Sequence, residues 1–149
     1  MSIGTITVGL RDDLRSNLTD PINRGAQWIH RGKIEETSKT PAIYVELAPS
    51  PRHDNYTGGG QVHYYNHHVH VVVRDGDRGV SVVGGSGDII TSSDELRDNI
   101  VQGIINRFHE AQFSISGAST LTLNNVSGEW NVTQDRIAVT LDYTSEEAL

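Results

Sequence analysis

The sequence predicts an α+β fold, in which an antiparallel or mixed β-sheet of four or more strands packs with two amphipathic helices and carries a long loop or arm. Two segments have apolar residues at helical spacing, and several others have the composition and alternation of strands. The length of 149 residues suits one domain with a modest core. We therefore expect a single domain over residues 1–149, with the arm near residues 48–61 and a loose acidic tail at residues 144–149.

The first helix is expected over Ile3–Leu18, and Asp20-Pro21 is expected to end it. Its apolar residues recur at intervals of three or four and so share one helical face: Ile3, Ile6, Leu10, Leu14 and Leu18. After it, Pro21–Thr40 is polar and irregular, and the pair Trp28-Ile29 is expected to be a short strand or an anchor on the core.

The second helix is expected over Ser93–Ala111. Ser92 and Glu95 have the spacing of a capping box, in which each side chain satisfies a backbone amide of the first turn. Gly103, in the middle, is expected where the helix packs closely on a neighbour. The apolar residues again form one stripe: Leu96, Ile100, Ile104 and Phe108.

Strands are expected in six places: Pro41–Leu47, Gln61–Arg74, Val80–Val83, Ser114–Leu123, Val126–Val132 and Arg136–Tyr143. Asp75–Gly79, Asn124-Asn125 and Thr133–Asp135 have the composition of turns, and Gly84–Gly87 that of a flexible linker. Ala48–Gly60 contains Pro, Gly and charged residues and is far longer than a hairpin needs. Such length in a loop or protruding arm is usually functional or serves assembly.

The charge pattern opposes some partners. The net charge is -7, and the twelve basic residues form no cluster that would wrap nucleic acid. The sequence has ten Arg, two Lys and eleven Asp. This balance is typical of proteins from salt-accumulating halophiles, although a GC-rich genome gives the same preference for Arg. No apolar segment is long enough to predict a membrane span, and cysteine is absent.

Four of the seven histidines lie between His63 and His70, in the segment QVHYYNHHVHVVVR. In a strand, alternation places His63 and His67 on one face and His68 and His70 on the other. A His-x-His pair can bind a metal, so His68 and His70 are weak candidate ligands, but Glu46 or His53 would have to complete the set. We favour a structural and interface strand, with no metal and no cofactor.

Catalytic constellations are not evident in the sequence. It contains no Gly-x-Ser-x-Gly elbow and no His-Glu-x-x-His helix. The carboxylate pairs Asp12-Asp13 and Glu35-Glu36 are adjacent, and solvated charge is their ordinary interpretation. We therefore expect no enzyme and no catalytic residues, with a small metal- or ligand-binding enzyme domain built on the His63–His70 cluster as a remaining alternative.

The layout resembles that of the tail terminator (tail completion) proteins of tailed viruses. The segments that carry the resemblance are Ile3–Leu18, KTPAIYVELAPSP, the arm at His53–Gly60, QVHYYNHHVHVVVRD, SSDELRDNIVQGIINRFHE and DRIAVTLDYT. The resemblance is one of pattern over most of the chain, without signature residues.

The resemblance implies a structural virion protein that forms a ring, usually of six subunits, at the end of the tail tube. Its partners would be further copies of itself, the major tail tube protein and a neck or head-completion protein, with DNA passing through the lumen without specific binding. A neck or head-completion connector is the close alternative. The candidate interface residues are Arg52, His53, Asp54, Asn55, Tyr56, His63, Tyr65 and His67.

Overall fold

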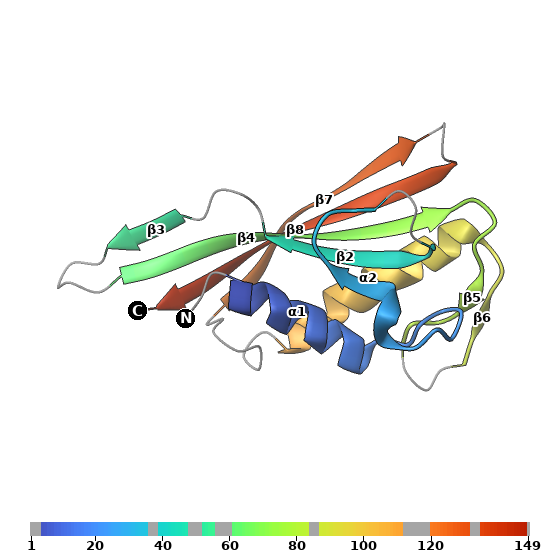
Figure 1. Ribbon diagram of the computed structural model, residues 1–149, viewed down its shortest axis with the longest axis horizontal. Helices are drawn as coiled ribbons and strands as arrows, with labels where there is room; N and C mark the ends of the chain where they lie inside the picture. Colours follow the sequence, from blue (N-terminus) through green and yellow to red (C-terminus); the bar gives the residue numbers. More distant parts are fainter. Residues whose placement is uncertain are drawn as a thin grey trace.

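A computed structural model describes residues 4–35, 39–47, 52–55, 61–83, 87–111, 120–131 and 135–148. Two α-helices and eight strands follow one another with a short 3₁₀ turn near the start (Figure 1). In chain order they are α1 Gly4–Asn17, η1 Ala26–Trp28, β1 Ile29–Arg31, β2 Ala42–Leu47, β3 Arg52–Asn55, β4 Gln61–Arg74, β5 Gly79–Val80, β6 Ile89–Ile90, α2 Ser93–Ala111, β7 Thr120–Asn131 and β8 Arg136–Ala148.

The main sheet is mixed and has the order β1-β2-β4-β8-β7. The pair β1–β2 is parallel and the other pairs are antiparallel. Strand β3 pairs with β4 on the same side as β2, so β2 and β3 follow each other along one edge of β4. The predicted α+β class with a sheet of four or more strands is therefore confirmed.

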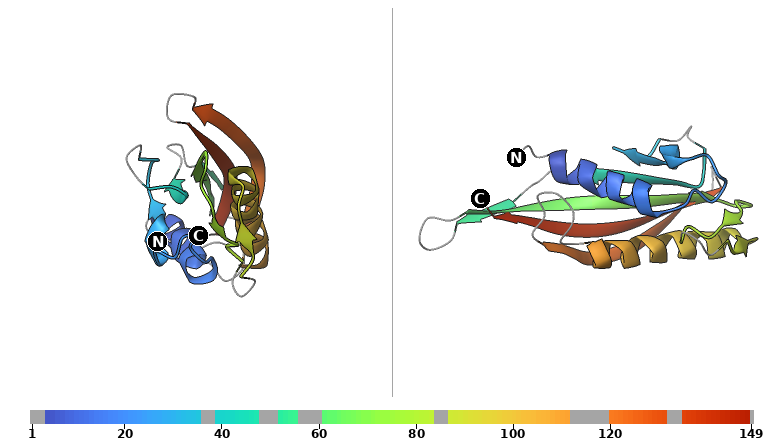
Figure 2. Two further views of the ribbon diagram at one scale, coloured as in Figure 1. Left: turned by 90° about the vertical axis from the view of Figure 1, so that its right-hand side faces the viewer. Right: turned by 90° about the horizontal axis from the view of Figure 1, so that it is seen from below.

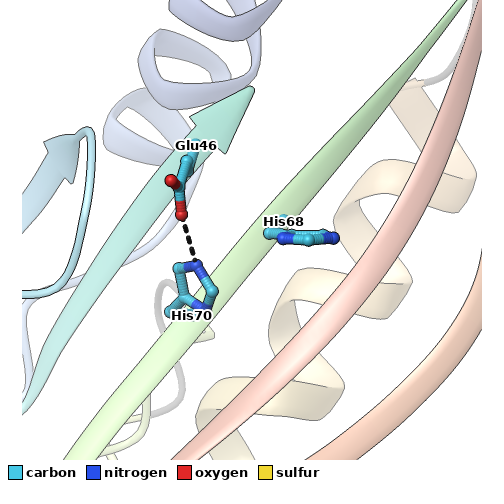
Figure 3. Close-up of side chains that lie close together, drawn as sticks. All are labelled: Glu46, His68 and His70. Atoms are coloured by element: carbon cyan, nitrogen blue, oxygen red, sulfur yellow. Dashed lines mark hydrogen bonds and ion pairs between the residues drawn. The ribbon is translucent and has the colours of Figure 1, made fainter. Parts of the chain in front are cut away.

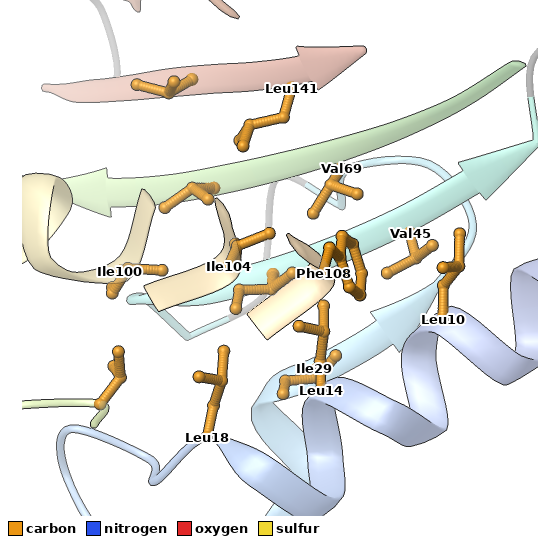
Figure 4. Close-up of a cluster of buried hydrophobic side chains, with 14 of the residues drawn as sticks. Leu10, Leu14, Leu18, Ile29, Val45, Val69, Ile100, Ile104, Phe108 and Leu141 are labelled. Carbon is orange, nitrogen blue, oxygen red and sulfur yellow. The ribbon is translucent and has the colours of Figure 1, made fainter. Parts of the chain in front are cut away.

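Both helices cover one face of the sheet, α1 against β1 and β2, and α2 against β4 and β7 (Figure 2). The predicted apolar stripes of the helices are buried at Ile6, Leu10, Leu14 and Leu18 and at Leu96, Ile100, Ile104 and Phe108. They meet the inward residues of the strands, among them Val45, Val69 and Leu141, in one continuous core (Figure 4). Burial of these stripes explains why segments with several β-branched residues are helical here.

Specific contacts join the helices to each other and to Val82. The guanidinium of Arg107 on α2 donates two hydrogen bonds, of 2.9 and 2.7 Å, to the carboxylate of Asp13 on α1. At Gly103, an added Cβ would lie 2.7 Å from Cγ2 of Val82, so the backbone of α2 packs directly on this residue. The close packing predicted for Gly103 is thus confirmed.

In the described part of the chain, neither helix is long and apolar enough to cross a membrane.

The central strand β4 is longer than the helical layer that covers it. Its 14 residues span about 46 Å at roughly 3.3 Å per residue, whereas the 14 residues of α1 span about 21 Å at 1.5 Å per residue. One end of β4, paired with β3 and with the last residues of β8, therefore extends beyond α1 (Figure 1). We call this three-stranded end, made of residues 52–55, 61–64 and 146–148, the projection.

Several predicted boundaries are wrong. Asn124-Asn125 is not a turn: one continuous strand, β7, runs through this point with a bulge between Leu123 and Asn125. Residues 144–148 are not a loose tail, because they continue β8 and pair with β4 up to Ala148. The segment after the turn at Asp75–Gly79 does not return along β4. It forms a separate two-stranded ribbon, in which Gly79 and Val80 pair with Ile90 and Ile89.

The arm expected at residues 48–61 is a strand in part, since β3 pairs with β4 from Arg52↔Tyr64 to Asn55↔Gln61. The rest of the arm, with Tyr56, lies outside the described residues. So do Gly84–Ser86 of the expected linker and most of the strand expected at Ser114–Leu123.

Candidate functional site

The face of the sheet opposite the helices carries a group of polar side chains at its centre. Alternation along β4 directs Val69 and Val71 into the core and His68 and His70 to this outer face, as predicted. The register places Glu46 of β2 and Asp142 of β8 on either side of His68. The next row holds His70 between Tyr44 of β2 and Thr140 of β8.

His70 is fixed through both ring nitrogens. Its Nε2 lies 3.0 Å from Oε2 of Glu46 (Figure 3). Its Nδ1 lies 2.8 Å from Oγ1 of Thr140. The His70 side chain is only 12% exposed, and that of Glu46 is 23% exposed. This partial burial strengthens the hydrogen bond between the ring and the carboxylate relative to one on an open surface.

His68 lies beside His70 and Glu46, and its side chain is more exposed than either of theirs. Its ring stands nearly perpendicular to that of His70, with centroids 5.8 Å apart. Its Nε2 lies 3.8 Å from Oδ1 of Asp142, which is too long for a hydrogen bond. Within the described part of the chain, that Oδ1 atom is buried and has no hydrogen-bond partner.

Potential ligand atoms of Glu46, His68 and His70 lie within 4.8 Å of one another. Two imidazoles and a carboxylate can form a charged hydrogen-bonded group, or they can ligate a divalent transition metal. We name Glu46, His68 and His70 the outer triad. From the sequence, Glu46 was expected as a residue that would have to complete a site, and the structure brings it to both histidines. His53, the other residue so named, lies on β3 opposite His63.

The outer triad has two neighbours that sequence reasoning missed. Asp142 and Thr140 alternate with core residues in a strand that was correctly predicted, but nothing in a single sequence gives the register of that strand with β4. The alternation of residues 136–143 was the available signal, because it placed both side chains on the polar face.

His67 has a different role from its neighbours. Its side chain is fully buried on the helical face, with Nε2 2.7 Å from Oγ of Ser145 and Nδ1 3.3 Å from Oγ1 of Thr7. Burial, and secondarily the charge of His68, lowers the pKa of His67 to about 4. Tyr65 is also buried on this face. Tyr65 and His67, two of the residues expected at an interface, are thus buried inside the subunit itself, and their side chains do not lie on its surface.

The other interface candidates that the structure describes lie on the projection. Arg52, His53, Asp54 and Asn55 form β3, and His63 lies opposite His53 and Glu147 in the register of β4. The backbone of these residues is thus at the end of the sheet that extends beyond α1.

Comparison with known proteins finds likeness at the level of the fold. No protein-family model matches the chain. Nor does any curated protein match its sequence. Among solved structures, the chain is similar to one from "Virion of native gene transfer agent (GTA) particle", with a TM-score of 0.59 and 12% identity. The match covers 98% of this chain and 96% of that chain. The fold is thus shared, over nearly the whole length of both chains, with a chain of a virion particle.

Proposed function

We propose that the chain is a structural protein of a tailed virus or a related particle, and that it acts as a ring-forming tail terminator. The observation that carries this proposal is the fold match over 98% of the chain to a component of a gene transfer agent virion. Because the match spans nearly all of both chains, it concerns a whole subunit and not a widespread motif. The layout resemblance noted from the sequence points to the same class of protein.

The shape of the molecule suits a ring subunit. The projection extends past the helical layer, and its β3 strand is paired on one side only among the described residues. A protruding β-structure with a free edge can add to the sheet or surface of an adjacent copy. The net charge of -7 would keep a ring lumen from adhering to passing DNA. In this role the chain carries out no catalytic step.

Assembly state is the first test. Tag-free protein should be measured by light scattering after size exclusion and by native mass spectrometry, in dilute buffer and in multimolar salt. We expect a closed oligomer of fixed subunit number, with six as the expected number, visible as a ring by electron microscopy. A chain that stays monomeric at high concentration in both buffers would contradict the proposal.

The second test separates the terminator from a neck or head-completion connector. The purified chain should be added to the major tail tube protein of the same particle as that protein polymerises. A terminator binds the tube end and stops elongation, so tubes become shorter as more of the chain is added. A connector leaves tube length unchanged and binds the head-side component instead.

A further inference from the structure

We propose that the outer triad, Glu46, His68 and His70, binds one divalent transition metal ion of the zinc class. The proposal is independent of the proposed ring function, because it rests only on side chains within one subunit. It differs from the expectation drawn from the sequence, which favoured a structural strand without a metal.

The separations between the candidate ligand atoms are already close to those of a metal site, before any side chain moves. A tetrahedral zinc ion with bonds of about 2.0–2.1 Å holds its ligand atoms about 3.3–3.4 Å apart. The separation between Nε2 of His70 and Oε2 of Glu46 is 3.0 Å, and all three candidate ligand atoms lie within 4.8 Å of one another. A small rotation of the His68 ring, which is 36% exposed, brings the third ligand into range.

The strands fix the ligands in the required arrangement. His68 and His70 are two residues apart on one face of β4, and Glu46 lies directly opposite His68 on β2. The sheet therefore holds three ligands on two adjacent paired strands, where backbone hydrogen bonds limit their movement (Figure 3). Two nitrogen ligands and one oxygen ligand form a set that suits zinc and leaves a fourth position for water.

A second layer of residues supports the same interpretation. Thr140 contacts Nδ1 of His70, which orients the ring so that Nε2 faces Glu46. Asp142 faces Nε2 of His68, and its buried Oδ1 has no hydrogen-bond partner among the described residues. Metal-binding histidines characteristically have such an oxygen at the second ring nitrogen. With Asp142 at Nε2, the nitrogen of His68 that is left for the ion is Nδ1.

The carboxylates around the outer triad favour the binding of a divalent cation. Glu46 and Asp142 each contribute a carboxylate on either side of His68, in one cross-strand row. A dication with two neutral imidazoles neutralises these two carboxylates. Mg²⁺ and Ca²⁺ are expected to bind poorly, because both prefer oxygen ligands to imidazole.

The test begins with metal content. Tag-free protein stripped with chelator should be loaded with Zn²⁺, desalted and analysed for metal, and the dissociation constant should be measured by calorimetry. We expect one zinc ion per chain. His68→Ala, His70→Ala and Glu46→Gln should each raise the dissociation constant at least tenfold, and Thr140→Val should raise it about tenfold through loss of orientation.

His109→Ala is the matched control, because His109 is an exposed histidine near the end of α2. This variant should bind zinc as the wild type does. X-ray absorption of the zinc-loaded wild type should show two imidazoles in the coordination sphere, and this measurement does not depend on any variant folding. Substoichiometric zinc, affinity unchanged in both histidine variants, or a coordination sphere without imidazole would overturn the proposal.

Discussion

Acidification should destabilise the protein through the buried histidine His67. The change to examine is a decrease in pH from 7 to 4, measured for the wild type and for His67→Gln. Burial lowers the pKa of His67 to about 4 in the folded chain, from an ordinary value of 6.5. The unfolded chain therefore binds a proton at this residue at a higher pH than the folded chain does.

The sign and the size of the effect follow from this difference. Above pH 6.5 the residue is neutral in both states and has no effect on the pH dependence. Between pH 6.5 and about pH 4, protonation favours the unfolded state by about 1.4 kcal/mol for each pH unit. The total loss is about 3 kcal/mol, a large part of the 5–15 kcal/mol that is typical of a domain.

The structure explains why protonation is costly here. The His67 ring contacts the hydroxyls of Thr7 and Ser145, and neither can compensate a positive charge as a carboxylate would. Opposite His67 in the register, the sheet provides Leu47 and Tyr143. Tyr143 stays neutral throughout this range, because burial raises its pKa.

Urea unfolding, followed by fluorescence of the buried Trp28, gives the free energy at each pH. Chelator should be present throughout, so that no metal contributes. The wild type should lose about 3 kcal/mol more than His67→Gln between pH 7 and pH 4. His30, whose pKa is also lowered by burial, is present in both proteins and cancels. His109→Gln, in which the exposed histidine is changed, should follow the wild type. Equal losses in the wild type and in His67→Gln would refute the reasoning.

Three further predictions concern packing and assembly. Ile104→Ala should lower the free energy of unfolding by about 2–5 kcal/mol, because Ile104 is fully buried; a cost below about half a kcal/mol in denaturant titration would contradict its place in the core. Gly103→Ala should also destabilise, since its Cβ would meet Val82, and Val82→Ala in the same chain should reverse that loss; a stabilising Gly103→Ala would argue against close packing. Deletion of Arg52–Gly60 should leave unfolding cooperative but impair ring formation, whereas Asp75→Ala, in the turn at the other end of β4, should not; intact rings after the deletion would exclude an assembly role for the arm.

The helices and the central strand could be predicted because their signals are local. The stripes at Ile6–Leu18 and Leu96–Phe108 repeat with the helical period, and the boundaries of α2 agree with the prediction at both ends. The capping residue confirms one of them: Oγ of Ser92 accepts a hydrogen bond, at 3.5 Å, from the backbone amide of Glu95. Alternation likewise separated His67 from His68 and His70, since a strand has only two faces.

The errors concern features that depend on pairing. Asn124-Asn125 has the composition of a turn, but the partner strand β8 holds it in a bulged strand. The acidic end of the chain is unfavourable for a strand by composition, yet β4 provides a continuous edge that pairs as far as Ala148. The outer triad depends on pairing too, because the register between β2 and β4 brings Glu46 to His68. The register cannot be inferred from local composition. The candidate ligand residues could therefore be named from the sequence, but their proximity in the fold could not be predicted.

The two proposals concern different parts of β4 and can fail separately. The proposed ring contact uses the projection, whose β4 part ends at Tyr64, four residues before His68, whereas the outer triad lies where β4 is paired with β2 and β8. Measuring assembly in chelator, with and without the triad variants, therefore isolates the contribution of the projection. Rings that form equally well in chelator and in His70→Ala would assign assembly to the projection alone and leave zinc binding as a property of the single subunit. Rings that require zinc would show that the fourth ligand position of the ion, or the sheet face around it, takes part in subunit contact.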